Sequence, residues 1–194
     1  MRTFTSIIVL LFYIACSNTN HAKELYNKAL TRYANKDFEG ASTLCLESIK
    51  KADLPDSYLL LAKIYFFTNN SNFEKTIEKY IRLTDSSQGY ILYARWFIRN
   101  QKQDQAIRYL EKALLHSPND PVALYLLGTI QYANKQYDDA IITFHRAFAN
   151  YFPLMQIHRQ LQEIYNEIHL PERAAKHQAI LEAIKQFDDS TNGE

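Results

Sequence analysis

Small residues recur at a fixed spacing along the chain, and this period constrains the fold more than any other feature. Ala106 and Ala140 lie 34 positions apart, and a similar ten-residue phrase occurs twice, as RYANKDFEGA at residues 32–41 and as QYANKQYDDA at residues 131–140. Self-similarity at a period of about 20–50 residues is typical of stacked repeats. The spacing therefore predicts one structural unit that occurs several times between residues 32 and 140.

The composition favours helices as the contents of that unit. The 194 residues include only four glycines, which leaves little material for hairpin turns or for loops that bind phosphate. The five prolines fall where helices are expected to start, and there a missing N–H does no harm. Small residues in register allow two antiparallel helices to approach closely, while large neighbours interdigitate around them.

The copies of the unit share a register that identifies their family. The clearest copy, from residue 121 to about residue 153, carries Leu124, Leu127, Gly128, Tyr137, Ala140, Phe144 and Ala147. This pattern resembles the tetratricopeptide repeat (TPR), whose 34-residue helix–turn–helix period is a property of that family. Weaker copies precede it, and a degenerate copy with Leu161, Tyr165 and Ala174 follows it.

The resemblance implies an all-α fold. We expect a right-handed α-solenoid of antiparallel helix pairs, with about ten helices in four to five repeats over residues 22–187. The helix from Pro171 to Phe187 is expected to act as a polar C-terminal cap, and residues 188–194 are expected to form a disordered tail.

The N-terminus is a separate segment. An apolar run from Ile7 to Ala15 follows Arg2, and it is shorter than the about 20 residues that cross a bilayer. It is typical of a signal peptide. Its end, Tyr-Ile-Ala-Cys at residues 13–16, resembles the lipobox of bacterial lipoproteins, although Tyr13 stands where leucine is usual. The alternative is an ordinary signal peptide or a short anchor helix with an incidental cysteine.

That resemblance implies lipidation of Cys16, with residues 1–15 removed as a signal peptide and residues 16–21 forming a lipidated tether. Removal of the leader deletes Arg2 and leaves 21 basic and 21 acidic residues, so charge gives no argument for a nucleic-acid partner. The other cysteine, Cys45, lies at a core position of the first repeat, and we expect it to be buried and inert.

No motif for catalysis occurs in the chain, and we expect no enzyme, no cofactor and no metal. His-Glu-x-x-His, Gly-x-Ser-x-Gly, P-loop and Cys-x-x-Cys patterns are all missing. His158 and His169 are eleven residues apart, about 16 Å along a helix, which is too far for one ion. Both are expected to be solvated surface histidines.

In the TPR family the first helix of each pair lines a concave groove. When those positions are carried over, they predict an aromatic and weakly basic surface made of Tyr26, Leu30, Tyr33, Leu59, Lys63, Phe66, Phe67, Ile91, Arg95, Ile98, Arg99, Tyr125, Thr129 and Tyr132. Such a surface suits an extended or helical segment of a partner protein. The alternative is that much of this stripe packs inside the superhelix.

We therefore expect a non-catalytic TPR scaffold lipoprotein of the bacterial cell envelope, which binds a partner protein in this groove. Ser17, where some inner-membrane lipoproteins carry aspartate, favours the periplasmic face of the outer membrane. The alternative function is an accessory subunit of a transport system that binds a small apolar ligand.

Overall fold

The computed structural model describes residues 2–148 and 154–191, and it describes side chains over residues 17–147 and 156–182. Ten helices and no strand occur in the described residues. The helices are α1 (Arg2–Ala34), α2 (Phe38–Lys51), α3 (Pro55–Thr68), α4 (Phe73–Thr84), α5 (Ser87–Arg99), α6 (Gln103–His116), α7 (Pro121–Ala133), α8 (Tyr137–Phe148), α9 (Leu154–Glu167) and α10 (Pro171–Thr191). The predicted all-α fold of about ten helices is confirmed.

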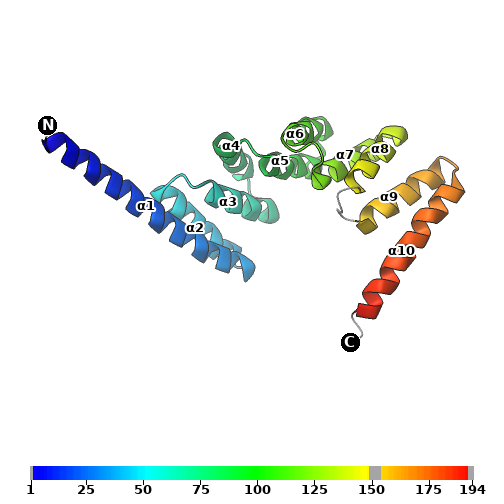
Figure 1. The fold of residues 1–194 in the computed structure, drawn as a ribbon, viewed down its shortest axis with the longest axis horizontal. Helices are drawn as coiled ribbons and strands as arrows, with labels where there is room; N and C mark the ends of the chain where they lie inside the picture. Colours follow the sequence, from blue (N-terminus) through cyan, green and yellow to red (C-terminus); the bar gives the residue numbers. More distant parts are fainter. Residues whose placement is uncertain (1, 149–153, 192–194) are drawn as a thin grey trace. The chain divides into compact units, whose positions relative to one another are not determined.

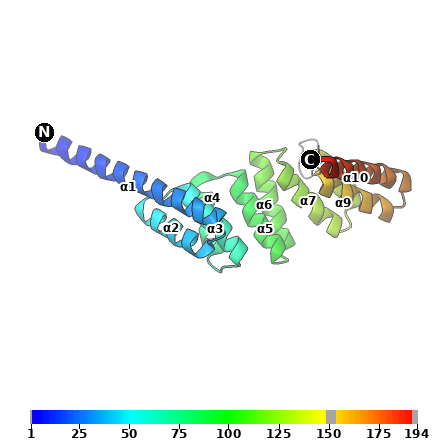
Figure 2. The same ribbon diagram turned by 90° about the horizontal axis from the view of Figure 1, so that it is seen from below.

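The chain forms two compact units, Met1–Leu92 and Tyr93–Glu194, and the boundary between them falls within α5. In the first unit α1 packs against α2, α2 against α3, and α3 against α4. In the second unit α6 packs against α7, and the same order continues to α10 (Figures 1 and 2). Within each unit these helices thus pack mainly on their sequence neighbours, as expected of a repeat protein.

The small residues of the repeat lie at the contacts between helices. Ala94, Ala106 and Ala140 are fully buried, and Gly128 is buried within its helix. A Cβ atom added to Gly128 would lie 2.8 Å from Cε1 of Phe144, whose side chain is itself completely buried. Glycine is therefore needed at position 128 so that α7 can approach the Phe144 ring on α8.

The turns inside the helix pairs share one backbone conformation, although none of them uses glycine. Lys36, Asn69, Gln101, Lys135 and His169 all have φ between 52° and 61°, in the left-handed region. In each turn the next backbone N–H donates to a carbonyl five residues back, for example Lys102 N to Phe97 O at 2.9 Å and Gln136 N to Gln131 O at 2.9 Å. This bonding pattern is the Schellman motif that ends a helix.

Caps at the helix starts complete the repeat. Pro55, Pro121 and Pro171 are the first residues of α3, α7 and α10, as the sequence predicts. The Asp120 carboxylate accepts hydrogen bonds from the N–H groups of Val122 and Ala123, both at 3.0 Å, so it satisfies donors that the helix leaves open.

A buried pair of hydroxyl groups joins three helices of the first unit. Ser48 of α2 donates to the carbonyl of Ala22 in α1 at 2.7 Å, and its Oγ lies 2.8 Å from that of Ser57 in α3. Both serine side chains are fully buried. Because the two hydroxyls are hydrogen-bonded, this polar contact can sit in the core without a large desolvation cost.

At both ends of the chain a helix extends into the segments that the sequence sets apart from the repeats. The predicted leader and tether lie within α1, apart from residue 1, and Ala22 is the first buried residue among the described side chains. At the other end α10 continues to Thr191, so residues 188–191 of the predicted tail are helical, and residues 192–194 lie outside the described part. Across the residues that the structure describes, no helix combines the length and the apolar character that a membrane span requires.

Candidate functional site

An aromatic cluster occupies the turn end of the first two helix pairs. The ring of Phe67 in α3 stacks on that of Phe38 in α2, with centroids 6.3 Å apart, and lies 6.5 Å from the ring of Tyr33 in α1. The Phe67 side chain is 57% exposed, whereas Phe66 beside it is 5% exposed and packs on Phe73. The cluster is therefore an apolar surface supported by a packed base, which is a typical feature of a protein-binding site.

The other predicted groove residues of the first unit differ in exposure. Leu59 is 9% exposed, so it and Phe66 belong to the core and offer little surface. Leu30 is exposed, while Tyr26, Lys63 and Ile91 are half-buried. Burial raises the pKa of the Tyr26 and Tyr33 phenols, which remain neutral at physiological pH.

In the second unit the predicted positions on α5 and α7 also reach the surface. Arg95 and Arg99 of α5 are exposed, and Ile98 between them is half-buried. On α7 the half-buried Tyr125 ring lies 6.1 Å from the ring of Phe144, and Thr129 donates to the Tyr125 carbonyl at 2.9 Å. These positions present aromatic, aliphatic and cationic groups, as the sequence predicts, and their binding role remains a prediction.

Tyr132, the last predicted position on α7, belongs to a polar contact that the sequence did not predict. Its hydroxyl donates to Oε1 of Glu167 at 2.7 Å, and the hydroxyl of Tyr137 in α8 donates to Oε2 of the same carboxylate at 2.7 Å. Glu167 thus joins α7 and α8 to α9. The two hydrogen bonds, that from Tyr132 being the stronger influence, hold the pKa of Glu167 below its usual value.

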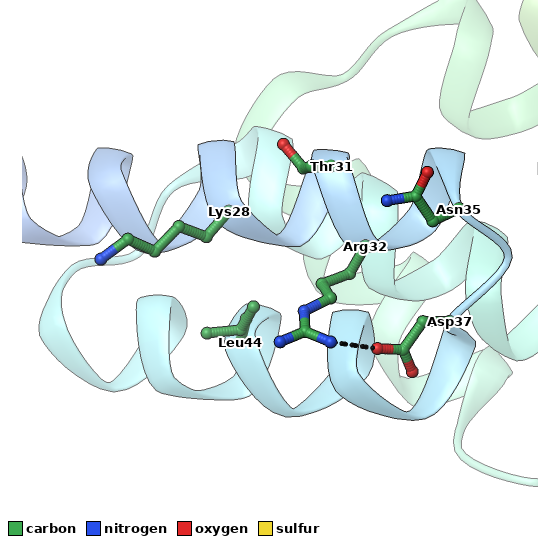
Figure 3. A pocket seen from close by; sticks show the side chains of 6 residues that line it. All are labelled: Lys28, Thr31, Arg32, Asn35, Asp37 and Leu44. Carbon is green, nitrogen blue, oxygen red and sulfur yellow. Dashed lines mark hydrogen bonds and ion pairs between the residues drawn. The ribbon is translucent and has the colours of Figure 1, made fainter.

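A shallow pocket on the α1–α2 pair is lined by Lys28, Thr31 and Arg32 of α1 and by Asn35, Asp37 and Leu44 (Figure 3). Its two cations already have acidic partners. Arg32 bonds to Asp37 at 3.0 Å and Lys28 to Glu24 at 2.8 Å. The pocket therefore offers no unneutralised charge that would attract an anion.

One of the two histidines that the sequence places on the surface is buried in the structure. His158 is 3% exposed, so the expectation of a solvated surface residue was wrong, because α10 brings His177 against it. Burial lowers the pKa of both rings, that of His177 to about 4. Among the described side chains, no group of three or more His, Cys, Asp or Glu is placed to hold a metal ion.

Cys45 is fully buried, as the sequence predicts, and burial raises the pKa of its thiol to about 12. It is therefore a poor nucleophile at neutral pH. The side chain of Cys16, the predicted lipidation site, lies outside the described residues.

Comparison with known proteins supports the repeat assignment. Residues 97–152 match the family model of the tetratricopeptide repeat. No curated protein sequence matches the chain.

Several solved structures share the fold at low sequence identity. MamA is 18% identical, with a TM-score of 0.70 over 84% of this chain and 96% of its own. PilW, a widely conserved type IV pilus biogenesis factor, is 16% identical, with a TM-score of 0.72 over 84% of this chain and 76% of its own. TTC0263, a thermophilic TPR protein of Thermus thermophilus, is 17% identical, with a TM-score of 0.62 over 82% of this chain and 89% of its own.

Proposed function

Because the chain is a tetratricopeptide-repeat protein, we propose that it is a non-catalytic scaffold of the bacterial cell envelope that binds a segment of a partner protein. A lipid on Cys16 tethers it to the membrane, at the periplasmic face of the outer membrane. The observation that carries the binding role is the aromatic cluster in which the exposed Phe67 ring packs on the half-buried rings of Tyr33 and Phe38. The fold supports the same role, because TPR domains generally act as interaction scaffolds without catalysis.

The chemistry of the surface suggests the class of segment that it binds. Aromatic anchors such as Phe67 supply large contact area at low entropic cost, and hot spots in interfaces are enriched in such residues. Lys63 lies on the same helix as Phe67, and its charge favours acidic residues of the partner. We therefore propose that the segment carries apolar side chains together with acidic ones.

The setting of the proposal is the assembly of envelope structures. PilW, one protein of similar fold, is a type IV pilus biogenesis factor, and such a role is compatible with a tethered scaffold. The alternative of a transport accessory subunit predicts a small apolar ligand in place of a protein segment.

Site-specific photocrosslinking in intact cells tests the proposal. A photoreactive phenylalanine analogue is placed at Phe67 or at Tyr125, each on the first helix of a pair. The matched controls are Leu115 on α6 and Ile142 on α8, which are highly exposed apolar residues on second helices. We expect one protein partner, identified by mass spectrometry, to crosslink from the first pair of positions only.

Either of two results would contradict the proposal. Equal crosslinking from Leu115 and Ile142 would place the partner on another face. If no protein adduct forms at Phe67 and Tyr125, while a small apolar molecule copurifies and is lost from a Phe67→Ser variant, the transport alternative replaces the scaffold.

A further inference from the structure

The helix α10 rests on α9 through a narrow face. Among its described side chains, those of residues 171–182, Ala174 and Leu181 are buried and His177 is half-buried, while the others are exposed. These three positions are spaced i, i+3 and i+7, so they share one side of the helix. In the part of the chain that the structure describes, α9 is the only helix on which the backbone of α10 packs. His177 is thus the central residue of the contact that holds α10.

The partner of His177 on α9 is a second histidine, His158, whose side chain is 3% exposed. The two Nδ1 atoms lie 2.7 Å apart, so one ring donates its N–H to the lone pair of the other. This hydrogen bond needs at least one unprotonated Nδ1, because two N–H groups cannot bond to each other. A first added proton places a charge in a buried site, and a second one also breaks the bond. The contact therefore favours neutral rings.

The groups that surround the pair do not favour a positive charge. On α8 the ring of His145 lies 6.4 Å from that of His177. On α9 the neutral Tyr165 ring stacks on His177, with centroids 5.5 Å apart, and the Arg173 guanidinium of α10 lies over the same tyrosine, 5.7 Å from its centroid. Burial and then the neighbouring histidines lower the pKa of both rings of the pair, that of His177 to about 4.

Carboxylates of α9 and α10 contact other groups. Glu167 accepts its two hydrogen bonds from tyrosines of α7 and α8, and Glu163 raises the pKa of one of these, Tyr132. On α10, Glu182 accepts a hydrogen bond from Gln178 at 2.6 Å. These contacts leave the three carboxylates engaged away from the histidine pair.

We propose that the pair of His158 and His177 is an acid-sensitive latch, which holds α10 on α9 near neutral pH and releases it when the pair is protonated. In the released form His177 returns to water, where the imidazole has its ordinary pKa of 6.5. The released form therefore binds more protons than the closed form between about pH 6.5 and pH 4, and closing weakens as the pH falls through this window. Above it both forms are neutral, and the closed form is fully stable.

Opening of the latch changes the surface of α9. Tyr165 is only 4% exposed, and both His177 and Arg173 of α10 lie against its ring. Release of α10 removes these two covering side chains and exposes the aromatic ring to solvent. The latch thus couples pH to the exposure of an apolar surface that is closed at neutral pH.

Hydrogen exchange of the full chain at pH 7.5 and pH 5 tests the latch. The readout is the opening of residues 171–182, after correction for the intrinsic dependence of exchange on pH. With pKa values of 6.5 released and about 4 closed, His177 alone should raise opening by about 30-fold between the two pH values. In the double variant His158→Gln/His177→Gln we expect a rise below about threefold, since neither amide titrates.

The matched control is His169→Gln, which removes an exposed imidazole at the turn between the same two helices. It should keep the rise of about 30-fold. Because each ratio compares one protein with itself at two pH values, a variant that is merely less stable does not imitate the expected result.

A second double variant, His158→Leu/His177→Leu, replaces the rings with an apolar pair and covers the case in which the glutamines loosen α10 at both pH values. It should also show a rise below about threefold. A rise as large as that of the wild type in both double variants would overturn the proposal. So would a wild-type rise below about threefold, or an equal rise in α2 and α7, which would indicate a general loss of structure in acid.

Discussion

At the residue scale, Gly128 and Phe144 show how one repeat accommodates a large side chain. The matched residues one repeat earlier are Ala94 and Leu110, both fully buried. The larger side chain of Phe144 in place of leucine is thus accompanied by glycine in place of alanine at position 128. The sequence alone predicted that a small residue on one helix faces a large residue on the next in each repeat. It did not predict the 2.8 Å approach of the ring, since that distance depends on how the two helices settle.

We expect Gly128→Ala to lower the free energy of unfolding by about 1 kcal/mol, because overpacking by about 1–3 kcal/mol exceeds the gain of up to about 1 kcal/mol in helix propensity. In a Phe144→Leu background the same change should cost nothing or stabilise the fold. Urea denaturation of the two single variants and the double variant gives the coupling. Additive effects would show that the ring does not limit the site.

The Glu167 carboxylate allows a prediction about pH. Its pKa is lowered in the folded state from a reference value of 4.5, so its contribution to stability is fully present above that value and is lost as the pH falls through the folded pKa. The stability difference between the wild type and Glu167→Gln should therefore be constant near neutral pH and should shrink below about pH 4.5.

Urea midpoints at pH 7 and pH 3.5 measure this difference. Glu163→Gln, an exposed change on the same helix, is the control, and it should show no comparable dependence on pH. If the Glu167→Gln difference is as large at pH 3.5 as at pH 7, the two tyrosine hydrogen bonds do not depend on the ionised carboxylate.

At the scale of the helices, their starts were predictable from sequence and the contacts between their side chains were not. Pro55, Pro121 and Pro171 begin helices as expected, because proline is compatible with the first turn. The bonds that join Glu167 to Tyr132 and His158 to His177 depend on the rotation of each helix about its axis. Periodicity does not specify that rotation closely enough to pair individual polar atoms.

Because the turn residues have positive φ, we expect glycine to stabilise the fold at these positions. Lys135 has φ of 60°, a conformation that costs a residue with a Cβ about 1 kcal/mol. Lys135→Gly should raise the free energy of unfolding by about that amount. Lys176→Gly, the same substitution within α10, should lower it by about 1 kcal/mol.

Urea denaturation compares both variants with Lys135→Ala, which removes the charge and keeps the Cβ, and which should give no gain. A gain from Lys135→Ala equal to that from glycine would mean that the charge, and not the backbone conformation, destabilises the turn.

At the scale of the whole molecule, the fold was predictable and the function was not. A 34-residue period of small residues specifies helix pairs that stack, whatever the exposed positions bind. Proteins of this fold at 16–18% identity include MamA and PilW, so the fold does not select a partner. The partner must be inferred from exposed side chains such as Phe67. Of two neighbouring residues expected on that surface, Phe67 is 57% exposed, whereas Phe66 is 5% exposed.

The proposed lipid anchor makes a prediction about the whole chain in cells. After removal of residues 1–15 the chain has 21 basic and 21 acidic residues, so charge would not hold it to a membrane. Each buried lipid methylene contributes about 0.8 kcal/mol, and stable anchoring takes two chains or more. Cys16→Ser should therefore abolish labelling with palmitate and move the protein to the soluble fraction, as judged by immunoblotting.

Cys45→Ser is the control and should leave both palmitate labelling and fractionation unchanged. Membrane retention of the Cys16→Ser chain would mean that another part of the protein attaches it.

The deep burial of Cys45 offers a simple chemical test of the proposed lipidation of Cys16. With that sulfur inaccessible to alkylating reagents, any maleimide taken up by the folded protein reports on the other cysteine alone. The fraction of the protein that shifts in mass on a gel after this treatment is therefore the fraction whose Cys16 is unmodified. After unfolding in urea each molecule should react at one more site, because Cys45 then becomes accessible.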